Sequence, residues 1–287
     1  MSVDTDIFYV IIRMYIPISE RKNFHMQEYV MGNGAIALGA LAAGVNLVAG
    51  YPGTPSSEIL ETISKYRHDG VYIEWSVNEK AAMEVAAAAA YSGARAMVTM
   101  KQVGLNVAAD PLMSLAYVGV KGGMVIVSAD DPGPISSQTE QDTRRFADFC
   151  RIPVFDPSSP EEAYKMIGEA FEYSEKYNTP VLFRPTTRVC HAYASIDNCD
   201  SPSPKKYEGF VKDSKKWVIF PRLSFANHIM IEKRNVEIGK DFSTYSANKA
   251  EGGNSEKAVV TSGISYAYAK ECLKDCLLYT SPSPRDA

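Results

Sequence analysis

Between residues 46 and 184, six short apolar segments alternate with helix-like stretches, and no other feature of the sequence constrains the fold as strongly. Strands that alternate with helices form parallel sheets, and continuously apolar strands indicate that helices cover both faces. We therefore predict an α/β domain with a doubly wound, mostly parallel sheet. The predicted strands are 46–49, 71–75, 96–100, 124–128, 154–155 and 181–184. The predicted helices are 35–43, 56–66, 79–91, 108–118, 141–149 and 160–176.

The same pattern divides the chain into five parts. The α/β domain is predicted to span 26–195, and the polar segment 196–255 is predicted to be a linker with some helix. Residues 256–275 contain a short apolar strand, a glycine turn and a helix, which predict the start of a second, incomplete α/β domain. Residues 1–25 precede Met26, and we expect them to be an extension outside the domain. Residues 276–287 follow the last helix without an evident cap or partner strand, and we expect a non-native tail.

Charge and cysteine spacing narrow the class of protein. The net charge of −4 leaves no basic face, so we expect neither nucleic acid nor an anionic membrane as a partner. The apolar stretch 7–18 is interrupted by Arg13 and is too short to span a bilayer. The cysteines form no CxxC pair, which argues against a zinc ribbon, a ferredoxin-type cluster or a secreted disulfide framework and favours a reducing cytoplasm. They are Cys150, Cys190, Cys199, Cys272 and Cys276.

Common nucleotide, hydrolase and metal motifs are missing from the sequence. It has no GxGxxG, Walker or GxSxG motif, and its four histidines fall in unrelated segments. We therefore predict no metal ligand in this chain.

The segment YPGTPSSEIL, residues 51–60, lies between a predicted strand and a predicted helix. Two prolines and three hydroxyl side chains interrupt the apolar pattern there, which indicates a turn at the carboxyl end of the strand. Open α/β sheets bind their ligands at such ends. The segment is therefore a candidate binding turn.

Residues 74–104 combine the end of a strand with a helix made largely of alanine. Its small side chains fit either tight packing on the sheet or a close contact with a partner. Glu79 stands in the first turn, and Ser76 three residues earlier predicts a capping box that needs no catalytic role.

The polar segment 128–145 follows another apolar strand. It is consistent with a solvated loop or with an active-site loop, and the pattern leaves both open.

Four motifs together carry a family resemblance: GNGAIALGALAAGV, GYPGTPSSEI, EWSVNEKAAMEVAAAAAYSGARAMVTMKQVGLNVAADPLM and SADDPGPISSQTEQDTR. They resemble the α subunits of indolepyruvate:ferredoxin oxidoreductases, which are thiamine-diphosphate-dependent 2-oxoacid:ferredoxin oxidoreductases. The resemblance covers 31–274. It implies that this chain is an amino-terminal fragment holding the domain that binds the aminopyrimidine half of thiamine diphosphate. Mg²⁺ and iron–sulfur clusters are implied only for a later part.

The implied reaction is oxidative decarboxylation of an arylpyruvate, with coenzyme A as acyl acceptor and ferredoxin as electron acceptor. The resemblance also implies a β subunit and therefore a hetero-oligomer. Two alternatives stay open: a subunit of a pyruvate or other 2-oxoacid oxidoreductase, and a non-catalytic module that docks a partner through the alanine-rich helix.

The resemblance also implies roles for individual residues of this chain that match functional positions of the family. Glu79 matches the glutamate that contacts the aminopyrimidine ring nitrogen, which makes it the predicted catalytic residue and a cofactor ligand. Thr54 matches a residue beside the substrate carboxylate, and Lys101 and Gln102 are also predicted to bind substrate.

Three further residues are implied to contact the cofactor, namely Pro52, Gly53 and Asn106. The chain departs from the family pattern at two positions. Gln102 stands where relatives often have His, which puts a proton-transfer role there in doubt, and Gly34 stands where they usually have Glu.

Overall fold

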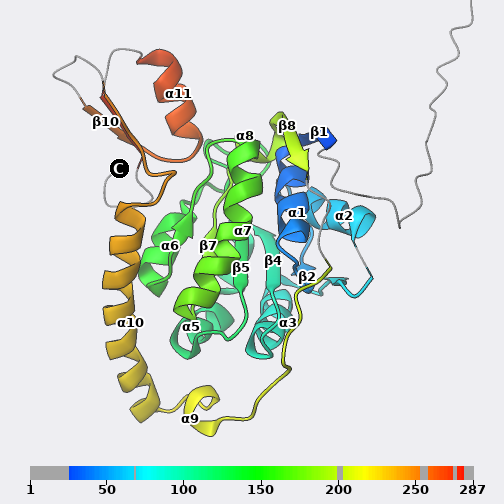
Figure 1. The fold of residues 1–287 in the computed structure, drawn as a ribbon, viewed down its shortest axis with the longest axis vertical. Helices are drawn as coiled ribbons and strands as arrows, with labels where there is room; N and C mark the ends of the chain where they lie inside the picture. Colours follow the sequence, from blue (N-terminus) through cyan, green and yellow to red (C-terminus); the bar gives the residue numbers. More distant parts are fainter. Residues whose placement is uncertain (1–25, 68, 199–202, 253–257, 274–276, 281–287) are drawn as a thin grey trace, which may run out of the picture.

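The computed structural model describes residues 26–67, 69–198, 203–252, 258–273 and 277–280 (Figure 1). The expected extension 1–25, Cys199, Cys276 and most of the expected tail lie outside these residues.

A six-stranded parallel sheet forms the centre of the molecule, in the order β3-β2-β4-β5-β7-β6. Every predicted strand is present within two residues of its expected bounds, so the predicted fold class is confirmed. The strands are β2 (Leu47–Gly50), β3 (Tyr72–Trp75), β4 (Ala96–Lys101), β5 (Met124–Ala129), β6 (Val154–Phe155) and β7 (Val181–Phe183).

Helices cover both faces of the sheet (Figure 1). Neighbouring strand residues alternate between two cores: Val125 and Val127 contribute to one, and Met124 and Ile126 to the other. One core is completed by α1 (Gly32–Ala42), α2 (Ser57–Tyr66) and α7 (Pro160–Tyr177). The other is completed by α3 (Glu79–Tyr91), α5 (Ala109–Val118) and α6 (Thr143–Cys150).

An antiparallel ribbon, which the sequence pattern did not predict, joins the two ends of this domain. In it, β1 (Met26–Met31) pairs with β8 (Tyr193–Asn198), and the ribbon packs on α1 through Ala194 and Ile196. Two short helices were also missed, α4 (Gln102–Val107) and α8 (Thr187–His191). A Cβ on Gly32 would lie 1.9 Å from the Val189 carbonyl oxygen, so glycine is required where α1 begins against α8.

The interval 196–255, expected to be a linker with some helix, contains two helices among its described residues. They are α9 (Ser214–Trp217) and the 23-residue helix α10 (Pro221–Ser243), which stands along one side of the molecule (Figure 1). Asn227, Ile231 and Ile238 are buried on one face of α10, as expected for a helix that packs on the α/β domain. The division of the chain into domains itself stays a prediction.

A small second sheet follows α10, in the order β10-β11-β9. Its elements are β9 (Ala250–Glu251), β10 (Ala258–Thr261), α11 (Ile264–Cys272) and β11 (Leu277–Thr280). Residues 277–280 belong to the expected tail, yet they pair with both β10 and β9, so the expectation that the tail has no partner strand is wrong for them. Within the part of the chain that is described, no helix is both long and apolar enough to cross a membrane.

Candidate functional site

The candidate site lies at the carboxyl edge of the sheet, where the chain reverses its order. From β2 the chain continues to β3 on one side and then to β4 on the other, so β2 and β4 flank a topological switch point. The turn 51–54 follows β2, and Lys101 ends β4. Glu79 begins α3 after the loop that leaves β3.

The turn after β2 is held by its own hydroxyl groups. The Ser56 N–H and hydroxyl both donate to the Gly53 carbonyl oxygen, at 2.8 and 2.9 Å, and the Gly53 N–H donates to Ser57 Oγ at 2.8 Å. Thr54 is exposed, and its hydroxyl has no hydrogen-bond partner among the described residues. Two of the three hydroxyls therefore shape the turn, and the third faces outward; Pro52 is exposed beside it.

Glu79 is a buried carboxylate at the start of α3, with 8% of its surface exposed. Its side chain lies against α4, because a Cβ on Gly104 would stand 2.5 Å from Glu79 Oε1. Within the described residues, no hydrogen-bond donor or cation is recorded for this carboxylate. Neither carboxylate oxygen is fully enclosed, so the carboxylate reaches the surface of the site and is a candidate for binding a donor group.

The predicted capping box between Ser76 and Glu79 is wrong. Asn78 is the N-cap of α3, and its side-chain oxygen accepts the Ala81 N–H at 2.9 Å. Ser76 instead donates to Glu74 Oε1 at 2.6 Å. Because the cap lies directly before Glu79, the Glu79 carboxylate is not needed to cap the helix.

Lys101 lies beside the turn after β2. A Cβ on Gly53 would be 3.1 Å from both Cγ and Cδ of Lys101, so the aliphatic stem runs across this glycine. The ammonium group donates to Gln138 Oε1 at 3.1 Å. The structure therefore brings together Gly53 and Lys101, which were predicted separately for cofactor and substrate.

Gln102 is completely buried under the loop between β5 and α6. Its amide nitrogen donates to the Thr139 carbonyl oxygen at 2.9 Å, and Ser137 Oγ lies 3.5 Å from its amide oxygen. Both ends of the side chain thus contact the loop, and substrate binding by Gln102 stays a prediction. Asn106, in α4, is exposed.

The loop that covers Gln102 is held at its base by Asp131, a residue that the sequence pattern did not single out. Asp131 Oδ2 accepts the backbone N–H groups of Ile135, Ser136 and Ser137 at 2.8–2.9 Å, and Oδ1 accepts the Thr187 hydroxyl at 2.7 Å. Burial raises the pKa of Asp131, but these donors outweigh it and hold the pKa at about 2. The polar segment is therefore an ordered loop at the carboxyl edge.

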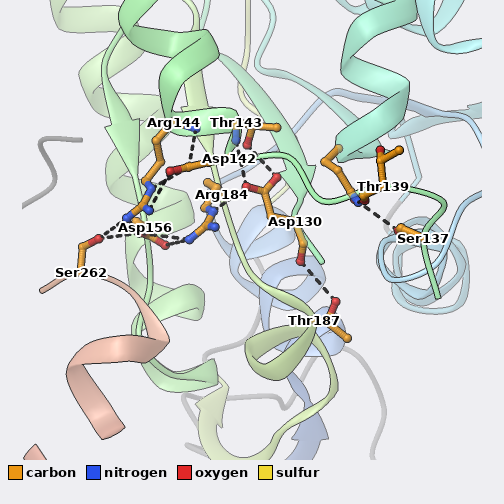
Figure 2. A network of polar contacts seen from close by, with 11 residues as sticks. Asp130, Ser137, Thr139, Asp142, Thr143, Arg144, Asp156, Arg184, Thr187 and Ser262 are labelled. Carbon is orange, nitrogen blue, oxygen red and sulfur yellow. Dashed lines mark hydrogen bonds and ion pairs between the residues drawn. The ribbon is translucent and has the colours of Figure 1, made fainter. Parts of the chain in front are cut away.

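A buried ion-pair network lies on the other side of Asp130 from Ser137 and Thr139 (Figure 2). Arg184 Nε donates to Asp130 at 2.8 Å, and the Thr143 N–H and hydroxyl also donate to Asp130. Burial raises the pKa of Asp130 despite the lowering by Arg184.

The same network reaches the second sheet (Figure 2). Arg144 pairs with Asp142 at 2.8 Å and with Asp156 at 3.4 Å, and its Nη1 donates to Ser262 Oγ at 2.5 Å. The network therefore joins the ends of β5, β6 and β7 to the strand–helix turn after β10.

Gly34, where the sequence predicts a departure from the family pattern, lies within α1. A Cβ on Gly34 would make an ordinary 3.4 Å contact with Val30 Cβ. The neighbouring Asn33 is buried and donates to the Pro55 carbonyl oxygen at 2.7 Å and to Glu58 Oε2 at 2.9 Å. Asn33 thus ties the start of α1 to Pro55 and Glu58 in the segment 51–60.

Comparison with protein families gives a match over residues 38–248 to the model described as "Pyruvate flavodoxin/ferredoxin oxidoreductase, thiamine diP-bdg". The chain belongs to this family. The chain is 43% identical over 251 residues to indolepyruvate oxidoreductase subunit IorA of Pyrococcus horikoshii, a match that spans 85% of the chain and 39% of that relative. For the same subunit of Thermococcus kodakarensis the identity is 45%, with the same coverage.

Less similar relatives carry the name of a different enzyme. The chain is 30% identical to 2-oxoglutarate synthase subunit KorA of Methanocaldococcus jannaschii, over 74% of the chain and 60% of that relative. Among solved structures, 2-oxoglutarate:ferredoxin oxidoreductase from Magnetococcus marinus matches with a TM-score of 0.72 and 14% identity, over 90% of this chain and 54% of that one. This structural likeness supports the fold.

Proposed function

We propose that this chain contributes the aminopyrimidine-binding part of a thiamine-diphosphate-dependent 2-oxoacid:ferredoxin oxidoreductase. The proposed enzyme oxidatively decarboxylates an arylpyruvate such as indolepyruvate to the acyl-CoA and transfers the electrons to ferredoxin. The observation that carries the proposal is Glu79, a largely buried residue at the carboxyl edge of the sheet whose carboxylate has no partner in the part of the chain that the structure describes. The names of the most similar relatives support the arylpyruvate, since six of them are indolepyruvate oxidoreductase subunits.

The residues around Glu79 fit the aminopyrimidine half of thiamine diphosphate. A buried, unpaired carboxylate suits a protonated ring nitrogen, and Gly104 leaves the carboxylate room that a side chain would fill. We propose that Glu79 is the catalytic residue and cofactor ligand, with Pro52, Gly53 and Asn106 as further cofactor contacts. We place the Mg²⁺ and iron–sulfur sites outside this chain.

When bound, thiamine diphosphate supplies the electron sink that stabilises the carbonyl carbon as CO₂ leaves. Glu79 would hold a proton between its carboxylate oxygen and the ring nitrogen. Lys101 Nζ would bind the substrate carboxylate, and Thr54 Oγ1 would donate a second hydrogen bond to it. Gln102, which the resemblance implies to bind substrate, would do so only after its hydrogen bonds with the loop break.

The complete enzyme is proposed to be a hetero-oligomer with a β subunit, located in the cytoplasm. The three described cysteines, Cys150, Cys190 and Cys272, are free thiols, which is consistent with a reducing compartment.

A second candidate substrate is a different 2-oxoacid, because 2-oxoglutarate synthase subunits are among the relatives. The test is turnover by the complete enzyme of indolepyruvate, phenylpyruvate, pyruvate and 2-oxoglutarate, followed by reduction of ferredoxin in the presence of coenzyme A. The proposal predicts the highest kcat/KM for the two arylpyruvates. A preference for 2-oxoglutarate or pyruvate would favour the second candidate, and no turnover of any 2-oxoacid would contradict both.

A further inference from the structure

The loop between β5 and α6 crosses the carboxyl end of β4. It contacts Lys101, the last residue of β4, and Gln102, the first residue of α4. We propose that Gln138, on this loop, is a positioning residue for the substrate. Its neutral amide oxygen holds the Lys101 ammonium group beside the turn after β2, and a substrate carboxylate displaces it. This inference rests on the proposed function, because it requires a carboxylate-bearing substrate at Lys101.

The position of Gln138 is determined by contacts on both sides of it in the loop. On its amino-terminal side, Asp131 accepts the N–H groups of Ile135, Ser136 and Ser137. On its carboxyl-terminal side, the buried amide of Gln102 binds the Thr139 carbonyl oxygen at 2.9 Å. Hydrogen bonds therefore fix the backbone on both sides of Gln138, although its own side chain is exposed.

The position of Lys101 is determined in the same way. Its stem lies across Gly53, and a larger residue there would meet Cγ and Cδ at 3.1 Å. The 3.1 Å contact from Nζ to Gln138 Oε1 then sets the end of the side chain. A lysine held at both points loses less rotamer entropy when it binds an anion than a freely rotating one.

The charge of Lys101 is left available by this arrangement. An ammonium group has three donors, and Gln138 occupies one of them. Within the described residues no carboxylate lies within 4 Å of Lys101 Nζ, so the charge is not neutralised by an ion pair. Because a carboxylate adds the attraction of an opposite charge, which the neutral amide oxygen of Gln138 lacks, a substrate carboxylate competes well with Gln138 for the ammonium group.

A carboxylate at position 138 would have the opposite effect. Gln138→Glu keeps the length of the side chain but forms an ion pair with Lys101, which the substrate would have to break. We expect this substitution in the complete enzyme to raise KM for the preferred 2-oxoacid by about 10- to 100-fold, the range for a hydrogen bond to a charged group, with kcat within about threefold of wild type. Gln141→Glu makes the same charge change on the same loop, and we expect its KM to stay within about threefold of wild type.

The experiment combines these variants with Lys101→Gln, which removes the ammonium. In the Lys101→Gln background, Gln138→Glu should raise KM by less than about threefold, because the ion pair can no longer form. Melting temperatures of all variants report whether the loop stays folded.

The inference is overturned if Gln138→Glu and Gln141→Glu give the same KM, or if the effect of Gln138→Glu persists without Lys101. If the wild-type enzyme turns over no 2-oxoacid, the proposed function fails and the inference fails with it; if wild type is active and only the Gln138 result fails, the proposed function stands.

Discussion

Glu79 and Gly104 belong to different helices and meet at the carboxyl edge of the sheet. A methyl group on Gly104 would stand 2.5 Å from Glu79 Oε1 and 2.8 Å from its Cγ, closer than side-chain carbons approach other atoms. The absence of a side chain on Gly104 is therefore what allows the buried carboxylate of Glu79 to keep its place.

Gly104→Ala tests this relationship. Alanine suits the helical backbone of α4, so the contact with Glu79 is the main obstacle to it. We expect the carboxylate to be displaced, with kcat/KM of the complete enzyme lowered by at least about 10-fold and stability lowered by about 1–3 kcal/mol from overpacking. Steady-state kinetics and denaturant unfolding measure the two effects.

The control is Gly239→Ala in α10, where none of the described residues lies within 4 Å of the added Cβ. This variant should be more stable than wild type by about 0.5–1 kcal/mol, because alanine favours the helix, and its kinetics should not change. Wild-type kcat/KM in Gly104→Ala would show that the position of Glu79 does not depend on Gly104.

Acid stability tests the role of Asp131 in holding the loop. Its pKa is about 2, below the usual value of 3.8, so its ionised form stabilises the folded state above pH 4, and this contribution is lost as the pH falls through 2. Between pH 5 and pH 2 the free energy of unfolding should therefore fall by about 2 kcal/mol more in wild type than in Asp131→Asn.

The control for Asp131 is Asp110→Asn, which removes a carboxylate whose side chain is 77% exposed. Its acid dependence should match wild type to within about 0.5 kcal/mol. Parallel pH profiles for wild type and Asp131→Asn would contradict the assigned hydrogen bonds.

Two isoleucines of α10 test whether this helix packs on the α/β domain in solution. Ile231 is 4% exposed and Ile229 is 44% exposed, on different faces of the same helix. Ile231→Ala should cost about 2–4 kcal/mol in free energy of unfolding, and Ile229→Ala less than about 1 kcal/mol. Chemical denaturation measures both, and equal small losses would mean that α10 does not pack on the α/β domain in solution.

The sheet was predictable because each strand can be recognised from the residues of its own segment. Each buried parallel strand is a continuous apolar run, as in β5, where every residue is buried. The strand ends then placed the turn 51–54 and Lys101 at one edge, since parallel strands all end on the same side.

The remaining structure depends on contacts that are distant in sequence. Met26 pairs with Asn198 in the β1–β8 ribbon, and neither strand has the apolar content of a buried one. In α10 the apolar residues of the buried face are interrupted by Arg234, which made this segment resemble a polar linker.

The site itself was only partly predictable for the same reason. The sequence indicated a cap at the start of α3 but placed it at Ser76, whereas the backbone path makes Asn78 the N-cap. Gln138 had no signal of its own, because its contact with Lys101 exists only once Asp131 and Gln102 have folded the loop.

The central claim is that Glu79 exchanges a proton with the cofactor, and Glu79→Gln in the complete enzyme tests it most directly. Glutamine keeps the size of the side chain, and Asn78 still caps α3, so the melting temperature should stay close to wild type. The measurement is hydrogen–deuterium exchange at C2 of bound thiamine diphosphate, which should slow by about 10²- to 10⁴-fold, the usual contribution of a general acid–base group. Asn78→Ala is the structural control, expected to cost about 1 kcal/mol of stability and to leave exchange unchanged. Exchange at the wild-type rate in a folded Glu79→Gln enzyme would contradict the catalytic assignment of Glu79.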